Sequence, residues 1–524
     1  ERRDEEADQT ARRVADAQQT LADARESQRD SAVQAARHIV DAQRALQIPT
    51  GLEEPGGIGE GVVALVHARR VAGTAHGLEL LRLPEAARFQ SLLQHGAMVR
   101  REAEAIDALD DHEGFGLLAH GLGRSYGDAA VIEDGRVVLT QRLNRMLAFD
   151  PETGWLRCEA GVSLKEIIDT FLPRGYFPPV VPGTQFVTVG GAVGCNIHGK
   201  NHHVDGCFGD HVRRVELLTA SGEIVICDRD SEPELFWATV GGLGLTGMIL
   251  SLEVQLYPVE SAAIEMESVR VENLDEFFAA SDESGDFTHT VSWVDCTKTG
   301  ASMGRGILMR GRHAPAGAVT SPGAVDRLAA LVGKLVDPKR LESNLWLNKA
   351  TMMMFNEAFF RKEKPGTTPS TVDYVPFFFP LDAVPNWNYL YGRRGFFQYQ
   401  LVVPDREAAR ECLRLTSETG MASFLCVIKE FGDIDHGGLS FPMQGITIAL
   451  DFPNLGAPLF ALFDALDEVV LEAGGRVYLG KDARLPIERF RRMYPEWAKW
   501  KAVRDAWDPH GVFKSELGLR LGLC

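Results

Sequence analysis

The chain has 524 residues and a mass of 57.6 kDa, which is more than one hydrophobic core usually covers, so we expect two folded domains and an extension. A formal net charge of −18 argues against nucleic acid as a partner, because phosphate backbones are bound through clusters of lysine and arginine. The sequence contains neither an apolar run of the roughly 18 residues that span a bilayer nor a signal peptide. We expect a protein of the cytoplasm or of the periphery of the cell envelope, whose start at Glu1 suggests a processed or excised end.

Eight scattered cysteines without a CxxC pair indicate reduced thiols and not a disulfide framework. Cys195, His198, His202, His203 and Cys207 offer metal ligands at short spacing. Structural zinc sites usually pair their ligands two to four residues apart, whereas these alternate with glycine-rich turns. We therefore expect no metal site.

Residues 1–47 contain no Pro, Gly or aromatic side chain, and small apolar residues recur in them at roughly helical spacing. This pattern predicts one or two helices that end before Pro49. The apolar stripe is mostly alanine and buries little area, which favours a helix packed on the main body or frayed in solvent over an oligomerisation arm. We treat residues 1–80 as a helical extension of unknown role.

From about residue 82 the sequence pattern predicts short strands mixed with helix, which is typical of an α+β domain. The helical spacing is found at 164–172. Strand-like runs separated by turn signals lie at 116–119, 137–140, 156–162, 212–218, 224–227 and 248–256.

A second region covers 259–475 and is followed by a compact helical tail. Its strand-like runs lie at 397–403, 424–428 and 446–452. A Gly/Ala/Pro-rich stretch at 311–324 and a polar loop at 362–372 separate them, and such long loops are usually mobile or functional. The apolar cluster Met352-Met-Met-Phe355 with Phe359-Phe360 fits either a substrate groove or a helix packed in the core.

Two glycine-rich loops carry the chemical information. The first is GLGRSYGD at 121–128, and the second lies within VPGTQFVTVGGAVGCNIHGKNHHVDGCF at 181–208. Glycine lets backbone N–H groups approach a phosphate without a Cβ clash. Two such loops in order predict a dinucleotide held along its length, with Gly190 and Gly191 making room for it.

Several motifs occur in a fixed order: GLGRSYGD, VPGT, TVGG, HGKNHH and, at 236–247, FWATVGGLGLTG. This set resembles the PCMH-type FAD-binding domain of the vanillyl-alcohol-oxidase superfamily. Within it the chain is most similar to the decaprenylphosphoryl-β-D-ribose 2′-oxidases, flavoenzymes of actinobacterial cell-wall synthesis. The resemblance covers roughly residues 95–524 and continues through SWVD, FFQYQLVVP, SFLCVIKEFG, LDFP, GGRVYLGKDAR and DPHGVFKSELGLRLGL.

The resemblance implies an α+β fold in which a two-subdomain FAD-binding domain at 81–258 is joined by a C-terminal segment at 476–524 that returns to it. An α+β substrate (cap) domain at 259–475 is inserted between them. The implied cofactor contacts are Gly121, Leu122, Gly123, Arg124, Ser125, Tyr126, Gly127, Asp128, Gly183, Thr184, Thr188, Val189, Gly190, Gly191, His198, Gly199, Lys200, Asn201, Ile249 and Tyr478.

The resemblance also implies that FAD is bound without a covalent link. Many relatives attach FAD through a His in the first loop, or through a His and a Cys. Here Arg124 stands at that place with Tyr126 nearby, and the segment 181–191 has no Cys.

The implied reaction oxidises a secondary alcohol to a ketone: a hydride moves to flavin N5 while a base takes the hydroxyl proton. A base needs hydrogen-bond reach and a pKa near the working pH. Lys481 is the leading candidate for base or substrate-side cation, because burial lowers the pKa of a lysine. His198 is the second candidate, with a purely structural role equally open, and Tyr126 lines the same pocket by resemblance. The implied substrate contacts are Trp293, Gln398, Gln400, Lys429 and Lys481, with packing equally open for Trp293.

The chain departs from the ribose oxidases at three positions. Ala449 stands where they carry a cysteine that nitroaromatic inhibitors trap, Thr447 replaces an Asn, and Gln185 replaces a basic residue. These changes concern the substrate more than the cofactor and leave room for a paralogue acting on another sugar or polyol.

Three functions stay open. The first is oxidation of a polyprenyl-phosphoryl pentose, with an NAD-dependent short-chain reductase as the partner that completes an epimerisation and with peripheral membrane contact. The second is a flavin oxidase of a free sugar, alditol or aldonolactone. The third is a non-enzymatic flavoprotein or interaction module; the set His198, Lys481 and Gln400 speaks against it.

Overall fold

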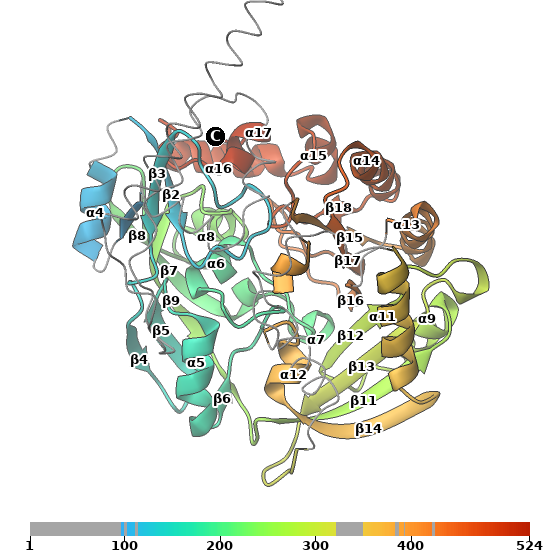
Figure 1. The fold of residues 1–524 in the computed structure, drawn as a ribbon. Coiled ribbons are helices and arrows are strands. Elements are labelled where there is room, and N and C mark those ends of the chain that lie inside the picture. Colours follow the sequence, from blue (N-terminus) through green and yellow to red (C-terminus); the bar gives the residue numbers. More distant parts are fainter. Residues whose placement is uncertain are drawn as a thin grey trace, which may run out of the picture. The chain divides into compact units, whose positions relative to one another are not determined.

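The computed structural model describes residues 96–98, 102–110, 114–320, 349–382, 387–391, 394–421 and 425–524. The predicted helices of residues 1–47 lie outside these ranges. The described part is a mixture of helices and sheets (Figure 1), which confirms the α+β prediction at that level.

A three-stranded parallel sheet carries the first glycine loop at its end. Its strand order is β1 (Gly96–Met98), β3 (Gly135–Leu139) and β2 (Gly116–His120). Helix α4 (Glu102–Asp110) shares a core with β2 and β3 through its alanines and Leu109. The C-terminal segment reaches the same sheet, because Leu117 bonds to Val512 and Lys514 through its backbone.

A five-stranded antiparallel sheet supports the second loop. Its order is β4 (Met146–Phe149), β5 (Trp155–Glu159), β9 (Met248–Gln255), β7 (Val212–Leu218) and β8 (Ile224–Asp228). The predicted strands at 116–119, 137–140, 156–162, 212–218, 224–227 and 248–256 are confirmed, with ends that differ by up to three residues. The strand pair β6 (Tyr176–Phe177) and β10 (Tyr257–Pro258) lies beside this sheet.

Helix α5 (Leu164–Phe171) confirms the helical spacing and shows its cause. Ser163 and Glu166 form a reciprocal capping box at its start, which satisfies two backbone N–H groups. The buried side chains follow at positions one, four, five and eight of the helix, the spacing of a single helical face. Helix α6 (Val189–Gly194), α7 (His202–Asp205) and α8 (Pro233–Thr239) follow along the chain.

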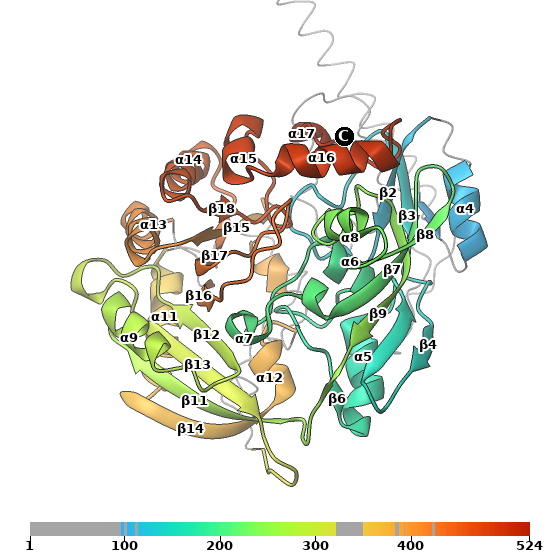
Figure 2. The ribbon, with the colours of Figure 1, turned by 180° about the vertical axis from the view of Figure 1, so that it is seen from behind.

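An eight-stranded sheet, whose neighbours all pair antiparallel, forms the rest of the described structure. Helices α9 (Leu274–Asp282), α13 (Arg406–Thr419) and α14 (Ala457–Glu472) pack against it (Figure 2). Phe463 of α14 stacks on Tyr399, so the face that carries the odd-numbered residues of β15 is the one α14 covers. The strand order is β14 (Gly366–Asp373), β11 (Ala263–Val271), β13 (Gly306–His313), β12 (His289–Val294), β16 (Cys426–Phe431), β17 (Gly445–Pro453), β15 (Phe396–Val403) and β18 (Arg476–Val477).

The predicted polar loop at 362–372 is wrong, because most of it is strand β14, paired with β11 over eight residues. Its threonines and Val372 are β-branched and suit a strand. Within the described residues β14 pairs with β11 alone, and an edge strand of this kind tolerates Pro369. The cluster at 352–360 lies on helix α11 (Lys349–Lys362), which buries Met352 and Phe360 and exposes other members.

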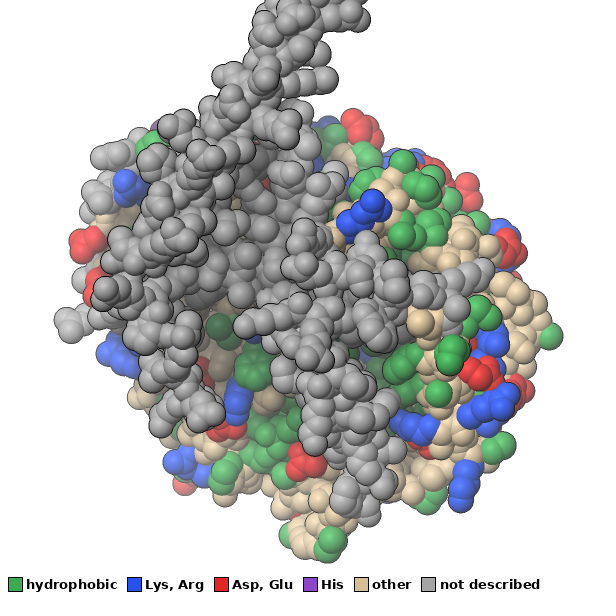
Figure 3. All heavy atoms as spheres, viewed as in Figure 1, with side chains coloured by type: hydrophobic (Ala, Val, Ile, Leu, Met, Phe, Trp, Pro, Cys, Tyr) green, Lys and Arg blue, Asp and Glu red, His purple; other side chains and the backbone are tan. Residues whose placement is uncertain are grey.

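The helical tail is present as α15 (Ile487–Met493), α16 (Trp497–Trp507) and α17 (Glu516–Arg520). Short helical segments also occur at α12 (Tyr374–Phe378) and in one-turn form at Trp387–Tyr391. On the described part of the face in Figure 3, lysines and arginines are interspersed with aspartates and glutamates around the rim. Within the described ranges, no helix is long and apolar enough to cross a membrane.

Candidate active site

The two glycine-rich loops lie directly against each other. A Cβ on Gly121 would be 2.3 Å from Oγ1 of Thr188, so the first loop crosses the start of α6 at van der Waals distance. Thr188 caps that helix, and its hydroxyl accepts a hydrogen bond from the N–H of Gly191 at 3.2 Å. Glycine at 121 is therefore required for the contact between the loops.

The first loop leaves backbone donors free. Gly123 adopts φ +64°, a left-handed conformation that glycine accepts at little cost. Among the described residues, no acceptor is found for the backbone N–H groups of Leu122, Gly123 and Ser125. Successive unpaired N–H groups on one loop form an anion-binding concavity. This part of the loop fits the pyrophosphate of a dinucleotide.

The second loop is built differently from the expectation. The N–H groups of Val189 and Gly190 bond to the carbonyls of Val162 and Ala160 at 2.8 and 2.9 Å, and that of Gly191 bonds to the capping threonine. A Cβ on Gly190 would be 2.9 Å from the Cβ of Ala160. Gly190 makes room for Ala160, and these N–H groups are paired within the protein, while the expected contact of Gly190 with a cofactor stays a prediction.

The end of the first loop is occupied by contacts within the protein. A Cβ on Gly127 would be 1.5 Å from the carbonyl oxygen of Asp482, so this glycine allows two backbones to touch. The carboxylate of Asp128 accepts two hydrogen bonds of 2.8 Å from Arg520. Gly127 therefore faces backbone at its Cα and the carboxylate of Asp128 is engaged by an arginine, while the expected cofactor contacts of both residues stay predictions.

Lys481 lies over the ring of Tyr126, with Nζ 4.0 Å from the ring centroid. The backbone fixes this pair, because the N–H of Tyr126 donates to the carbonyl of Gly480 at 3.2 Å. Burial lowers the pKa of Lys481 to about 8, while nearby Asp451 opposes the shift. Two predicted catalytic residues from distant parts of the sequence therefore meet, and one of them titrates near neutral pH.

His198 is buried and held by Gln400. The amide nitrogen of Gln400 donates to Nε2 of His198 at 3.1 Å and to the hydroxyl of Thr447 at 3.2 Å. Burial, with the nearby charge of Lys429, keeps the pKa of His198 well below its usual value, so the imidazole is neutral. Its proton then sits on Nδ1, which has no hydrogen-bond partner among the described residues. The geometry makes His198 a hydrogen-bond donor through Nδ1 and not a proton acceptor.

Three partly buried lysines lie close together near this histidine: the charges of Lys429 and Lys481 act on His198, and that of Lys200 acts on Lys429. Burial lowers the pKa of Lys200 to about 8, and burial together with the charges of Lys200 and Lys481 lowers that of Lys429 to about 7. The ammonium groups of Lys200 and Lys429 donate to the carbonyls of Phe378 and Gly199 at 3.1 and 3.2 Å. Within the described ranges, none of the three lysines has a carboxylate within 4 Å of its ammonium. Such a group of cations is suited to an anionic ligand.

Strand alternation brings the predicted substrate residues to one face of the eight-stranded sheet. Gln398 and Gln400 are two apart on β15, and Lys429 pairs with Thr447 on the next strands. This is the face opposite α14. Trp293 pairs with Val427 on the same face, but its ring is buried 4.7 Å from Phe359 in an apolar cluster under α11. Its surroundings are those of a packing residue.

Sequence reasoning missed Asp451. Its side chain is fully buried on the same face, and Gln398 donates to its Oδ1 at 2.6 Å. Its Oδ2 has no partner among the described residues, and burial raises the pKa of the carboxyl to about 7. The signal was available: LDFP places an acid opposite a glutamine on the polar side of an alternating strand.

The segment before α6 is placed beside the first loop. The guanidinium of Arg124 donates to the carbonyl of Phe186 at 3.0 Å. The N–H of Phe186 donates to the hydroxyl of Thr184 at 3.2 Å. A Cβ on Gly183 would meet nothing within 4 Å, so there is open space at this turn. This space is compatible with a ligand.

The remaining predicted contacts form the wall behind His198. The hydroxyl of Tyr478 donates to the carbonyl of Cys195 at 3.2 Å, and its ring lies 5.4 Å from that of His198. Asn201 is buried and donates to the carbonyl of Pro179 at 2.8 Å, which holds the loop that carries Gly199. Ile249 is buried on β9. These residues shape the site through packing and backbone support.

The donors without acceptors match a flavin dinucleotide. Among the described residues, the unpaired N–H groups of Leu122, Gly123 and Ser125 suit a pyrophosphate, Nδ1 of His198 suits an oxygen of the flavin ring, and the lysines suit a second anion. Within the described ranges, no group of three or more His, Cys, Asp or Glu side chains is arranged to hold a metal ion.

Comparison with known proteins agrees with this site. Residues 97–228 match the FAD binding domain family, and residues 452–520 match the D-arabinono-1,4-lactone oxidase family. The chain is 40% identical over 426 residues to decaprenylphosphoryl-beta-D-ribose oxidase of Mycolicibacterium smegmatis, which covers 80% of this chain and 92% of that protein.

Two further relatives show how far the similarity extends. An uncharacterised protein of Streptomyces coelicolor from the mprA 5′ region is 36% identical over 378 residues, 69% of this chain and all of that protein. L-gulonolactone oxidase of Scyliorhinus torazame is 30% identical over 140 residues, 26% of this chain and 31% of that protein. The chain therefore belongs to the decaprenylphosphoryl-beta-D-ribose oxidase family and is an FAD-dependent oxidoreductase that acts on CH–OH groups.

Proposed function

We propose that this chain oxidises the 2′-hydroxyl of a polyprenyl-phosphoryl ribose to a ketone, a step in the synthesis of cell-wall arabinan precursors. The relative with 92% of its length matched bears the name of an oxidase of such a lipid-linked ribose. The observation that carries the proposal is the set of partly buried lysines 200, 429 and 481, which form no ion pair with a carboxylate among the described residues. A sugar with an attached phosphate supplies both the hydroxyl for oxidation and the anion for these cations.

Bound FAD supplies the hydride acceptor for this oxidation. The residues of the chain handle the proton and hold the sugar. Lys481 and Asp451 titrate near neutral pH, and each can take a proton from a hydroxyl within hydrogen-bond reach. We assign the proton-accepting role to this pair and the orienting role to Gln400 and His198, whose hydrogen bond fixes the direction of the imidazole N–H.

We also propose that FAD is held without a covalent bond. Arg124 occupies the place of the histidine that carries the flavin in many relatives, and its guanidinium is bonded to Phe186. The Sγ of Cys195 lies 3.8 Å from the hydroxyl of Ser125 in the first loop. Burial raises the pKa of Cys195, which leaves the thiol protonated and a poor nucleophile.

The domain arrangement is part of the proposal. An inserted substrate domain at 259–475 between an FAD domain at 81–258 and a returning segment at 476–524 is supported by the backbone bonds that join Leu117 to Val512 and Lys514. The eight-stranded sheet also takes in β18, whose first residue is Arg476. The chain therefore passes from this sheet to the returning segment after Val477, two residues beyond the proposed boundary at 475.

A lipid-linked substrate implies two further proposals. We propose peripheral membrane contact, supported by Met353 and Met354, which are 41% and 73% exposed on α11. We also propose an NAD-dependent short-chain reductase as the partner enzyme, because a ketone at the 2′ position must be reduced from the opposite face to complete an epimerisation.

A second candidate function is oxidation of a free aldonolactone, alditol or sugar. The match of residues 452–520 to the D-arabinono-1,4-lactone oxidase family favours it. Thr447 and Ala449, which replace an Asn and a Cys of the resembled ribose oxidases, lie on the substrate face of β17.

Anaerobic reduction of the FAD-loaded protein separates the two functions. Bleaching of the flavin by polyprenyl-phosphoryl ribose, and by neither free pentose, alditols nor aldonolactones, supports the first; bleaching by the free compounds alone supports the second and overturns the first. Lys429→Ala should raise the KM for the phosphorylated substrate at least 10-fold. Lys165→Ala is the matched control, because that lysine lies on the exposed side of α5 in an ion pair with Asp169.

A further inference from the structure

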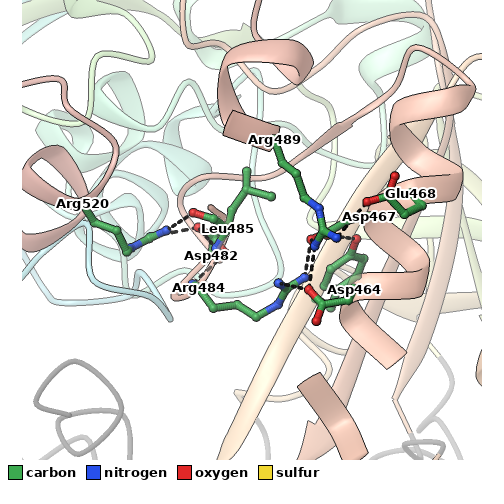
Figure 4. Close-up of polar contacts among 9 residues, drawn as sticks. Asp464, Asp467, Glu468, Asp482, Arg484, Leu485, Arg489 and Arg520 are labelled. Carbon is green, nitrogen blue, oxygen red and sulfur yellow. Dashed lines mark hydrogen bonds and ion pairs between the residues drawn. The ribbon is translucent and has the colours of Figure 1, made fainter. Parts of the chain in front are cut away.

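Arg520 joins two buried carboxylates from distant parts of the chain. Its Nε and Nη2 donate to Asp128 at 2.8 Å each, and Nη2 also donates to Asp482 at 2.9 Å. The third nitrogen, Nη1, donates to the carbonyl of Leu485 at 2.7 Å. Figure 4 shows Arg520 reaching Asp482 and Leu485 from its own helix, α17. All of its guanidinium nitrogens are therefore used within the protein.

The two carboxylates stand next to the proposed catalytic residues. Asp482 follows Lys481 directly, and Asp128 is two residues after Tyr126. The backbones of these two segments already touch, through the bond from Tyr126 to Gly480 and the contact of Gly127 with Asp482. Arg520 joins the same two segments through their carboxylates. The backbone bond, the glycine contact and this arginine together hold the segment that places Lys481 over the ring of Tyr126.

The other end of the turn is anchored separately. Arg484 bonds to Asp464 at 3.1 Å and to Asp467, and Arg489 bonds to Asp464, Asp467 and Glu468, all on α14 (Figure 4). This cluster holds the turn to the helix that covers the far face of the eight-stranded sheet. None of its side-chain bonds among the described residues reaches Asp128 or Asp482, but the backbone N–H of Arg484 donates to Oδ1 of Asp482 at 3.0 Å, so the two anchors adjoin at Asp482 and Arg489 belongs to the second alone.

We propose that Arg520 is a positioning residue for Lys481, which it sets relative to Tyr126 by bridging Asp128 and Asp482. The proposal rests on the proposed function only in that Lys481 takes part in the oxidation. Without Arg520, two buried carboxylates face each other without their shared cation, and the electrostatic repulsion between them separates the first loop from the turn. A displacement of about 1 Å of a catalytic group costs on the order of 100-fold in rate.

The test compares Arg520→Gln, Arg520→Lys and Arg489→Gln in the FAD-loaded protein. We expect Arg520→Gln to lower kcat for the sugar substrate about 100-fold. The KM should change less than about 3-fold, because Arg520 is not one of the proposed substrate contacts. The acid limb of the pH profile should move to higher pH, because a base acts in its deprotonated form and a less buried Lys481 regains a higher pKa. Arg520→Lys, which keeps one cation, should recover part of the rate, and Arg489→Gln should keep the wild-type pH profile.

A second readout needs no substrate. Acetic anhydride labels accessible amines, and mass spectrometry of the peptide that contains Lys481 reports its labelling rate. We expect this rate to rise at least 10-fold in Arg520→Gln and to stay unchanged in Arg489→Gln. Equal labelling in all proteins, or a loss of rate that is the same in both glutamine variants and follows their loss of thermal stability, overturns the proposal. If no sugar reduces the wild-type flavin, the proposed function fails and the labelling still decides the role of Arg520.

Discussion

Replacing Asp451 by Asn should make the protein more stable and less active. The carboxyl is fully buried, accepts one hydrogen bond from Gln398, and leaves its second oxygen without a partner among the described residues. Burial raises its pKa from 3.8 to about 7, so folding above neutral pH forces an ionised group out of water. An asparagine keeps the shape and the bond from Gln398 but carries no charge.

The sign and the size follow from proton linkage. A carboxyl whose pKa is raised by folding destabilises the folded state progressively as pH rises from about 4 to about 7, and the cost is constant above that. A shift of about three units at about 1.36 kcal/mol each gives an upper value of about 4 kcal/mol at pH 8 and about 2 kcal/mol at pH 5. Asp451→Asn should recover this cost, with a larger gain in Tm at pH 8 than at pH 5.

The assay is thermal unfolding of both proteins at the two pH values, together with steady-state kinetics at pH 8. Loss of a general base costs about 100-fold or more in kcat, while FAD content should stay at the wild-type level. Asp482→Asn is the contrast: burial alone would raise the pKa of Asp482, but Arg520 and two backbone N–H groups lower it, so this variant should lose stability at pH 8. If Asp451→Asn melts no higher than wild type at pH 8, the carboxyl is not desolvated and the reasoning fails.

Three further outcomes are expected. Lys481→Ala should abolish anaerobic flavin reduction while the protein keeps its FAD, as measured by absorbance; unchanged reduction removes this lysine from the mechanism. Acid precipitation should release FAD into the supernatant, because no histidyl or cysteinyl link is expected, and yellow colour in the pellet would contradict this. Gln400→Leu leaves Nε2 of His198 without its donor, which should lower kcat/KM at least 10-fold with FAD retained; a wild-type value would show that the His198–Gln400 bond does not orient the substrate.

The parts of the fold that depend on local pattern could be read from the sequence. Val212–Leu218 was predicted and is strand β7 to the residue, because a strand-like run followed by the turn signal Ala220-Ser-Gly222 marks a strand and its end. The helix at 164–172 was predicted from its spacing, and its capping box explains where it begins. The loop predicted at 362–372 was wrong, because the threonines, glycine and proline of this segment are as typical of loops as of an edge strand.

The roles of single residues in the site depend on contacts that no local pattern reveals. Gly190 and Asp128 were assigned to a cofactor because of the motifs that contain them. Within the protein they contact Ala160, which follows an earlier strand, and Arg520, which is 392 residues away, and neither contact could be predicted from the motifs. Asp451 lies within the motif LDFP but was not predicted as a site residue. What marks it is the burial of its carboxyl and an Oδ2 without a partner among the described residues, and the motif shows neither.

The partly buried lysines 200, 429 and 481 should take up protons from solvent when an anion binds beside them. With pKa values of about 7 and 8, they are only partly charged at pH 8 when no anion is near. A phosphate raises these values and draws hydrogen ions from the buffer as it enters. The heat released on binding should therefore vary with the ionisation enthalpy of the buffer. A bound dianion should also change the net charge of the protein by less than two units, because the protons taken up by the lysines offset part of its charge.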